Sequence, residues 1–449
     1  MDLAVSRRAI TTLLGLLMIA AVLAVAAPPA EATGAVVRVT SDADDGDGSL
    51  RDAVEAANGD ASIKQIIFGR DLTIDLMAPV VYTGDQDLTL RGNNTTVSGA
   101  SATQDLTWNS GLFVSASAAD LTIIRIDFVD SFNNGVAVLI PESATGTVGV
   151  TLDRVSIERA TFHGLYVDGQ VTADYNTDDE PHAACLDPHP YDSSAGIRLV
   201  VNRSAIVGNG RLPAGYDDST ATGCPRDFDG VRVDDGGTGG VDASVTHTVV
   251  TGNLADGIEY DERDAGHVTS FVAFSTISAN GESGETSDGL EDLDDGFDID
   301  EAGDGNLVAT FYRVDVEDNR DEGLDLDEEG NGDATLVVTR VNANRNEDQG
   351  VKIDESNDGS LTARIYRSTV SDSLSQDGIE FTEEDDGDLD GMIWRTTVTG
   401  NDDAGVKGEQ QPNGTGKLRI VDSDLSDNND GATDVDPGGI TLELVNVIV

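Results

Sequence analysis

Basic residues are scarce in this sequence. Lysine occurs four times, and all basic residues together number 27 against 84 acidic residues, so the formal net charge is −57. A surface this acidic repels nucleic acid and anionic membranes, which excludes both as partners. Such a charge balance is found in disordered chains, but the strict patterning of the apolar residues excludes disorder. Two explanations fit the acidity: life in concentrated salt, or the binding of divalent cations.

Long apolar segments are absent after the N-terminus, so we expect no membrane span. The apolar run at 13–27 is too short for a transmembrane helix. It follows Arg7 and Arg8 and precedes the small-x-small site Ala30-Glu31-Ala32. We therefore expect residues 1–32 to be a signal peptide, and the protein to be secreted, extracellular or at the cell surface. The paired arginines resemble a twin-arginine export signal, but they also occur in ordinary secretory signals.

Cysteine is nearly absent. The two cysteines are Cys185 and Cys224. Because an exported chain meets an oxidising compartment, we expect them to form one disulfide. His182 and His189 lie close to Cys185 in the sequence, so a zinc site is the alternative to a loop held by that disulfide.

A glycine recurs at a regular interval in the second half of the sequence. The steps between copies are 26 to 28 residues, with one step of 39. Each glycine opens a segment in which apolar and polar residues alternate, as in Gly323-Leu324-Asp325-Leu326-Asp327. Alternation with period two predicts a strand with one buried face. These glycines are Gly230, Gly257, Gly296, Gly323, Gly350, Gly378, Gly405 and Gly431.

Two further columns keep step with these glycines. A second glycine follows nine residues after the first, and an asparagine follows fourteen residues after that. We expect the asparagine at a sharp bend, because it tolerates the left-handed conformation and its amide can bond to the amides of adjacent coils. Ser373 takes its place in one copy. The column consists of Asn253, Asn280, Asn319, Asn346, Asn401 and Asn428.

Units of ~27 residues with several strands each cannot bury their apolar faces alone, so they must stack on one another. Each unit is then one coil, and like strands of successive coils pair in parallel. Helical repeats are excluded because the units lack helical periodicity, and propeller blades are longer, at ~40 residues. The predicted fold is all-β: a single-stranded parallel β-helix, which is a solenoid.

The coils resemble the right-handed parallel β-helix repeat of pectate-lyase-like proteins, where stacked asparagines at a turn are a recognised feature. The segment from Val37 to Asn58 is similar to the strand and helix that often begin exported β-helix proteins. Ser49 can cap that helix with Asp52, and such a capping helix would cover the open end of the first coil. The resemblance covers nearly all of residues 36–449 and implies the fold more strongly than an activity.

The expected organisation follows from these repeats. Glycine-led copies begin at Gly111, Gly135 and Gly164, and a third insertion near 281–294 explains the step of 39. Insertions on a rigid scaffold often carry binding. The expected segments are the signal peptide 1–32, an N-terminal cap with the first coils at 33–110, and the repeats at 111–449, which carry insertions 169–194 and 210–228.

Stacking turns each position into a row of side chains. Four and five residues after the first glycine come an aspartate and a glutamate, and we expect two acidic rows along the outside. Carboxylates ~5 Å apart repel by about 1 kcal/mol in water, so the rows need arginines, Ca²⁺ or salt as counter-charge. Ca²⁺ prefers several oxygen ligands, although no EF-hand loop is present. The candidate cation-binding residues are Asp261, Asp300, Asp327, Asp354, Glu301, Glu328 and Glu355.

An arginine row precedes the asparagine column by six residues. Spaced guanidiniums can bind the carboxylates of a uronic-acid polymer. The alternative is that the arginines offset the acidic rows and cover apolar surface with their stems. The row consists of Arg125, Arg154, Arg203, Arg313, Arg340, Arg367 and Arg395.

No compact catalytic constellation is present. Lyases of the resembled fold use Ca²⁺-binding acids with an arginine or lysine base, and its glycosidases use aspartate pairs. Aspartate pairs arise by chance in so acidic a chain, and the Gly-His-Gly and Arg-x-Lys motifs of polygalacturonases are absent. We expect a non-catalytic protein that binds a polysaccharide or cell-surface glycan, or is structural, with Ca²⁺ as cation. A Ca²⁺-dependent polysaccharide lyase and an adhesin-like stalk are the alternatives.

Overall fold

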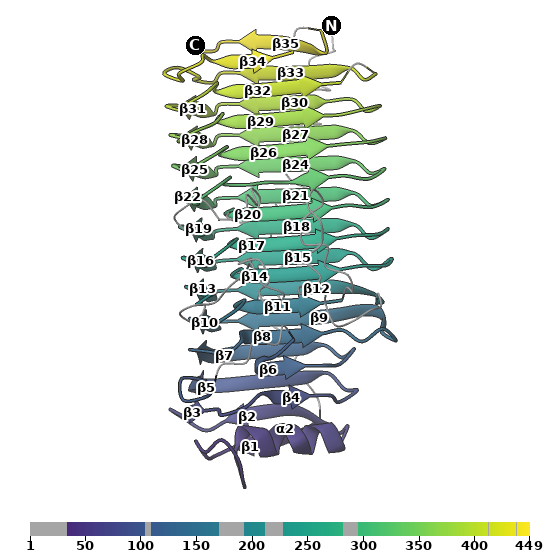
Figure 1. The fold of residues 1–449 in the computed structure, drawn as a ribbon, viewed down its shortest axis with the longest axis vertical. Helices are drawn as coiled ribbons and strands as arrows, with labels where there is room; N and C mark the ends of the chain where they lie inside the picture. The colour runs from purple at the N-terminus through teal and green to yellow at the C-terminus, as the bar shows by residue number, and fades with distance from the viewer. Residues whose placement is uncertain are drawn as a thin grey trace, which may run out of the picture. The chain divides into compact units, whose positions relative to one another are not determined.

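The computed structural model describes residues 34–103, 109–169, 193–211, 228–281, 295–411, 413–436 and 438–449. Within the unit Ala35–Val449, successive coils lie on one another and contribute strands to two sheets (Figure 1). Every strand pairing among these residues is parallel, as in the register Ile258↔Phe297. The predicted right-handed parallel β-helix is confirmed.

One sheet, the first stack, has twelve strands. Eleven of them contain or follow the glycines that were expected to lead the coils, including the earliest, Gly111. The strands are β4 (Val80–Tyr82), β6 (Gly111–Ser115), β8 (Asn134–Leu139), β11 (Leu165–Asp168), β14 (Val231–Asp235), β17 (Ile258–Glu262), β20 (Phe297–Glu301), β23 (Asp327–Glu328), β26 (Val351–Glu355), β29 (Ile379–Glu383), β32 (Val406–Gln410) and β34 (Thr433–Val435).

The other sheet contains two runs of strands joined at a bend. The second stack holds its longer strands: β1 (Ala35–Val39), β2 (Ile63–Phe68), β5 (Leu88–Ser98), β7 (Leu121–Val129), β9 (Thr145–Asp153), β12 (Ser194–Asn202), β15 (Val241–Thr246), β18 (Val268–Ala273), β21 (Leu307–Tyr312), β24 (Ala334–Thr339), β27 (Leu361–Tyr366), β30 (Asp390–Trp394), β33 (Gly416–Val421) and β35 (Ile440–Val445). The third stack holds three-residue strands: β3 (Thr73–Asp75), β10 (Ser156–Glu158), β13 (Ala205–Val207), β16 (Val249–Thr251), β19 (Thr276–Ser278), β22 (Asp315–Glu317), β25 (Asn342–Asn344), β28 (Thr369–Ser371) and β31 (Thr397–Thr399).

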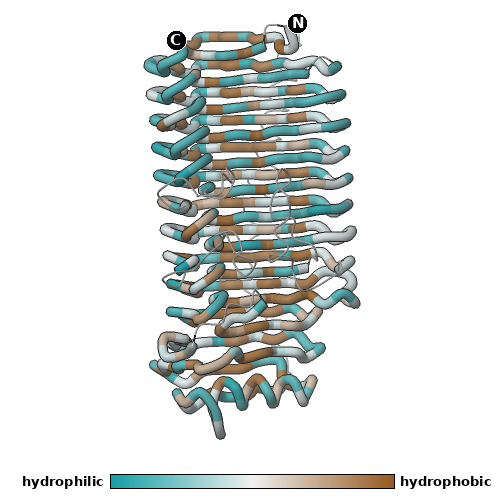
Figure 2. Tube along the Cα trace, viewed as in Figure 1, coloured by the Kyte–Doolittle hydropathy of each residue, from teal (hydrophilic) through white to brown (hydrophobic). Residues whose placement is uncertain are grey.

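The core lies between the stacks. In one coil, Phe297 and Ile299 of the first stack, Phe311 of the second and Val316 of the third are all fully buried. Phe297 meets Phe311 edge to face, with ring centroids 5.0 Å apart. Hydrophobic residues recur within the strands, and hydrophilic residues gather at the bends (Figure 2). Burying a large apolar side chain contributes about 1.5–3 kcal/mol, so the alternating pattern itself drives the stacking.

The asparagines form a hydrogen-bonded ladder at the bend after the third stack. Asn319 Nδ2 donates to Asn346 Oδ1 at 2.9 Å, and the backbone N–H of Asn319 donates to the same oxygen at 3.1 Å. Asn209, which was not predicted to belong to the asparagine column, donates to Asn253 in the same way at 2.9 Å. Of the two expected reasons for asparagine, the bonding of its amide to adjacent coils is confirmed, and the left-handed backbone is wrong, because the left-handed residue is the one before it, such as Asp318 with φ 61°. Asparagine is used for its amide.

We expect Asn319→Ala to lower the free energy of unfolding by about 1–3 kcal/mol, because it removes the acceptor of two buried donors of Asn280, the backbone N–H and Nδ2, and one of the two donors to Asn346 Oδ1. The measurement is the urea midpoint. Ser373→Asn is the matched variant, since Ser373 interrupts the ladder below Asn401. It should hold or raise the midpoint, and an unchanged midpoint in Asn319→Ala would show that the ladder contributes nothing.

One helix, α2 (Leu50–Gly59), precedes the first long strands. Ser49 caps it by accepting a hydrogen bond from Asp52 N at 3.1 Å, as expected. Its apolar side, including Leu50 and Val54, is buried. The helix lies beside β1, β2 and β4 at the purple end of the stack (Figure 1). Among the described residues, no helix is long and apolar enough to cross a membrane.

Candidate functional site

The outward side of the first stack carries three columns of charged residues, which we call the acidic face. They stand one before, two after and four after the leading glycine of each coil. Parallel register brings like positions together, as in Glu259↔Asp298 and Asp261↔Asp300. The acidic face comprises Asp229, Asp256, Asp295, Glu322 and Asp377; Arg232, Glu259, Asp298, Asp325, Lys352, Glu380 and Lys407; and Asp234, Asp261, Asp300, Asp327, Asp354 and Glu409.

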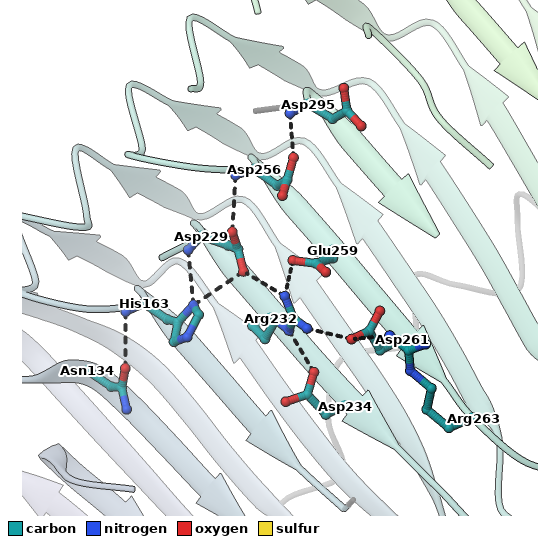
Figure 3. A network of polar contacts seen from close by, with 10 residues as sticks. All are labelled: Asn134, His163, Asp229, Arg232, Asp234, Asp256, Glu259, Asp261, Arg263 and Asp295. Carbon is teal, nitrogen blue, oxygen red and sulfur yellow. Dashed lines mark hydrogen bonds and ion pairs between the residues drawn. The ribbon is translucent and has the colours of Figure 1, made fainter. Parts of the chain in front are cut away.

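The first column is tied to the backbone of the neighbouring coils (Figure 3). Asp256 N donates to Asp229 Oδ1 at 3.1 Å, and Glu322 N donates to Asp295 Oδ1 at 2.6 Å. The buried His163 continues the column, because Asp229 N donates to its Nδ1 at 3.0 Å. The same Nδ1 lies 3.3 Å from Asp229 Oδ2. One oxygen of each of these carboxylates is thus committed to holding coils together.

Arg232 is the buried cation at one end of the acidic face. It is 1% exposed and donates to Asp234 Oδ1 at 2.6 Å, to Glu259 and to Asp261 (Figure 3). Burial raises the pKa of Asp234 to about 6, and Arg232 limits that rise. Burial would also raise the pKa of Asp261, but Arg232 and Arg263 outweigh it, and the pKa lies below its ordinary value.

Lys352 is the corresponding cation four coils further along the chain. Its Nζ lies 2.7 Å from Asp325, 3.7 Å from Asp327 and 3.8 Å from Asp354. Burial alone would lower the pKa of Lys352, but these carboxylates, together with Glu322, outweigh burial and hold the pKa well above its usual range. Lys352 therefore stays protonated and is a poor proton acceptor.

Carboxylates crowd the coils between these two cations. Burial, followed by neighbouring carboxylates, raises the pKa of Asp295 and of Glu322 well above the usual range. The same causes raise the pKa of Asp327, where Lys352 opposes the rise. Four trios have ligand oxygens within 4.8 Å of one another: Asp229–Asp256–Glu259, Glu259–Asp298–Asp300, Asp295–Asp321–Glu322 and Asp295–Asp298–Asp325.

The predicted aspartate row lies on the acidic face, where Asp300 pairs in register with Asp327 and Asp327 with Asp354. The glutamate row was wrongly expected on the outside. Glu301, Glu328 and Glu355 are at most 1% exposed. Successive residues of a strand point to opposite faces, so the glutamate, five residues after the glycine, shares the inward side with the apolar residues one and three after it.

We call this buried row the glutamate ladder: Glu262, Glu301, Glu328, Glu355 and Glu383. Its carboxylates hold the turn of the second glycine, for example where Gly266 N donates to Glu262 at 3.0 Å and Gly387 N donates to Glu383 at 2.8 Å. Burial, followed by hydrogen bonding to Glu328 and Glu262, raises the pKa of Glu301 to about 10. Burial and neighbouring carboxylates raise the pKa of Glu355 to about 9.

The sequence contained a sign of this ladder that the prediction did not use. The second glycine follows each ladder glutamate by four residues. A Cβ on Gly332 or Gly359 would collide with the carbonyl oxygen of the equivalent glycine one coil before, and also with the ladder glutamate. The glycine and the glutamate are therefore two parts of one tight turn.

Several predicted residues lie outside the described part of the chain. They are the cysteines of the expected disulfide and the histidines of the alternative zinc site, together with most of the two insertions that surround them. The residues concerned are Cys185, Cys224, His182 and His189.

The sequence matches no protein-family profile and no curated protein. Solved structures are similar in fold. The A-module of mannuronan C-5 epimerase AlgE6 from Azotobacter vinelandii is 12% identical, with a TM-score of 0.51 over 92% of this chain and 98% of that one. PfbA, a surface adhesin of Streptococcus pneumoniae, is 11% identical, with a TM-score of 0.40 over 92% and 93%. The similarity to the epimerase module shows that this chain shares the right-handed parallel β-helix fold.

Proposed function

We propose that this chain is an exported, non-catalytic β-helix protein that binds divalent cations, Ca²⁺ above all, on its acidic face and binds a glycan outside the cell or at its surface. The observation that carries the cation proposal is the crowding of carboxylate oxygens between Arg232 and Lys352. Oxygen-only ligands from several rigid strands suit Ca²⁺. The glycan is the ligand class that solved β-helix proteins such as the mannuronan epimerase suggest.

The raised pKa values of the acidic face support the same proposal. Asp295 and Glu322 must take up protons or gain a cation, because burial disfavours their charged forms. Glu259, Asp298 and Asp295 each belong to two of the four trios, and Asp298 joins the two in the middle of that series, so it is the central residue of the candidate site. Concentrated salt would screen these charges only diffusely, whereas a bound divalent cation would neutralise specific pairs.

The remaining parts of the chain take supporting roles in this proposal. Residues 1–32 form the signal peptide, residues 33–110 the cap and first coils, and residues 111–449 the repeats. Helix α2 closes the N-terminal end, as its contacts with β1, β2 and β4 suggest. The disulfide between Cys185 and Cys224 joins the two insertions.

We expect Ca²⁺ to raise the melting temperature well above the value in Na⁺ of equal ionic strength, and Asp298→Asn to weaken Ca²⁺ binding at least tenfold in calorimetry. Asp298→Asn keeps the size of the side chain and removes one ligand charge. Asp242→Asn, at an exposed position on β15, is the control and should bind like the parent. Equal stabilisation by Ca²⁺ and Na⁺ would reject specific sites and leave salt adaptation.

A Ca²⁺-dependent polysaccharide lyase, or another carbohydrate-active enzyme of this fold, is the second candidate. Basic side chains do lie among the acids of one face, as such a mechanism requires. However, the carboxylates around Lys352 keep its pKa high, which makes it a poor base. A lyase would release unsaturated uronides that absorb ultraviolet light, so absorbance after incubation with pectate or alginate, with and without Ca²⁺, separates the two candidates.

A further inference from the structure

The last four members of the arginine row form a continuous edge at the bend between the second and third stacks. Arg313, Arg340, Arg367 and Arg395, which we call the Arg ridge, each stand directly after a strand of the second stack. Their backbones are left-handed, with φ of 55°, 57°, 53° and 53°. Each N–H donates to a carbonyl of the next coil at 2.9–3.0 Å, as from Arg313 to Thr339. The side chains therefore repeat at the strand spacing of ~4.8 Å.

Arginine is energetically unfavourable at this bend. A left-handed backbone costs roughly 1–2 kcal/mol for a residue with a Cβ, and glycine would adopt it at lower cost. Adjacent guanidiniums also repel one another. The recurrence of arginine in four successive coils therefore points to a role for the side chain.

The expectation that these arginines offset the acidic rows is wrong for most of the ridge. Among the residues that the structure describes, no carboxylate lies within 4.0 Å of Arg313, Arg340 or Arg367, and all three are exposed. Arg395 has one distant partner, Asp422, at 3.8 Å. By contrast, Arg345 on the neighbouring bend binds Asp318 with both its Nε and Nη2 at 2.7 Å. Although the chain has 84 acidic residues, the Arg ridge is a positively charged stripe that is accessible to an external anion.

Aromatic rings hold the guanidiniums instead. The Tyr312 ring lies 5.3 Å from the guanidinium of Arg313 and 5.9 Å from that of Arg340, which also donates to the Tyr312 hydroxyl at 3.2 Å. The Trp394 ring lies 5.1 Å from Arg367 and 4.4 Å from Arg395. Such cation–π contacts orient the guanidiniums and still leave their N–H groups able to bind anions. The rings also add flat apolar surface of the kind on which sugars stack.

We infer that the Arg ridge binds a linear acidic polysaccharide whose rings carry carboxylate or sulfate groups. Such a polymer presents anions at regular intervals along a straight chain, matching a row of guanidiniums that can each bind an oxyanion with two N–H groups. The inference rests on the proposed glycan function and names its ligand class and site. It also removes the conflict between an acidic protein and an acidic ligand, because the ridge lies on a bend and not on the acidic face.

The test compares the full chain with the double variant Arg340→Gln/Arg367→Gln in calorimetry with alginate, polygalacturonate and heparin. Neutral dextran is the ligand control. We expect the parent to bind the acidic polymers and not dextran, and the double variant to lose at least tenfold in affinity with an unchanged melting temperature. The variant control is Arg345→Gln, an exposed arginine in the same coil as Arg340, which should bind like the parent.

Repeating the titration in EDTA separates this inference from the cation proposal. Binding through the ridge persists in EDTA and is lost in the double variant. Binding that needs Ca²⁺, fails in Asp298→Asn and survives in the double variant would overturn the ridge while supporting the proposed function. Absence of binding in every condition would overturn both, and equal binding of single-stranded DNA would overturn the assignment of a glycan.

Discussion

Raising the pH from 6 to 10 is expected to destabilise this protein, because the glutamate ladder loses shared protons. The pKa of Glu383 is raised to about 7, that of Glu355 to about 9 and that of Glu301 to about 10, with burial as the largest cause. These glutamates have ordinary pKa values near 4.3 when the chain is unfolded. The folded state therefore binds more protons than the unfolded state between those values, and its stability falls as the pH rises through 7, 9 and 10.

The size of the effect follows from the same linkage. A shift of one pKa unit corresponds to about 1.36 kcal/mol, so the loss amounts to several kcal/mol even after screening. Most proteins with paired carboxylates show the opposite trend and unfold in acid. Urea unfolding at pH 6, 8 and 10 measures the slope.

Glu301→Gln is the variant that tests the origin of this slope. No backbone N–H in the described part of the chain donates to either oxygen of Glu301, whereas an amide supplies an N–H donor at every pH. An amide already occurs in the coil after the last ladder glutamate. There, Gln410 pairs in register with Glu383, and Gln410 Nε2 donates to Gly387 O at 3.2 Å. We expect Glu301→Gln to flatten the alkaline loss of stability.

Glu328→Gln is the matched control, because Glu328 accepts from Gly330 N and Gly332 N at 3.1 and 3.2 Å. It should be destabilised at all three pH values. If the parent is as stable at pH 10 as at pH 6, the ladder does not share protons.

Removing the buried charge of Arg232 should produce the second large effect. Arg232→Met removes the guanidinium that Asp234, Glu259 and Asp261 share, and of the two cations beside Asp261 only Arg263 remains. Breaking a buried ion pair from one side costs about 3–5 kcal/mol. We expect a loss of this size in chemical denaturation at pH 7, and a smaller loss at pH 5, where the stranded carboxylates can take up protons.

Two further variants serve as controls for the Arg232→Met measurement. Arg198→Met removes an exposed ion pair with Asp120, at 3.1 Å, and should cost less than about 1 kcal/mol. Arg232→Lys keeps the charge, in a column where lysine already occurs as Lys352, and should recover part of the stability. A loss in Arg232→Met no larger than that in Arg198→Met would mean that the network does not stabilise the fold.

The repeat was predictable because its rules are local. Period-two alternation, the leading glycines and the asparagine spacing each depend on a few neighbouring residues. The error over the glutamate row was avoidable, because the same alternation assigns Glu301 to the side of Phe297 and Ile299. The role of Ser49 as the N-cap of α2 was likewise predictable from the sequence, since a cap depends only on the next three residues.

The convergence of side chains from different coils was not predictable in the same way. Nothing near Asp298 in the sequence shows that its carboxylate meets those of Glu259 and Asp325. The cation–π contacts of the Arg ridge depend equally on the offset between coils, because Tyr312 and Arg340 are 28 residues apart. The acidic background of the sequence hides which acids cluster.

The amino-acid sequence alone determined that the chain forms stacked parallel coils, since burial of alternating apolar residues leaves repeats of this length no other partner than one another. Only the tertiary structure decided which charges are buried, which are paired with an opposite charge and which stay exposed at the surface. The reason is that the energy of a charge depends on its surroundings within several ångströms, and in a solenoid those surroundings come mostly from the coils above and below.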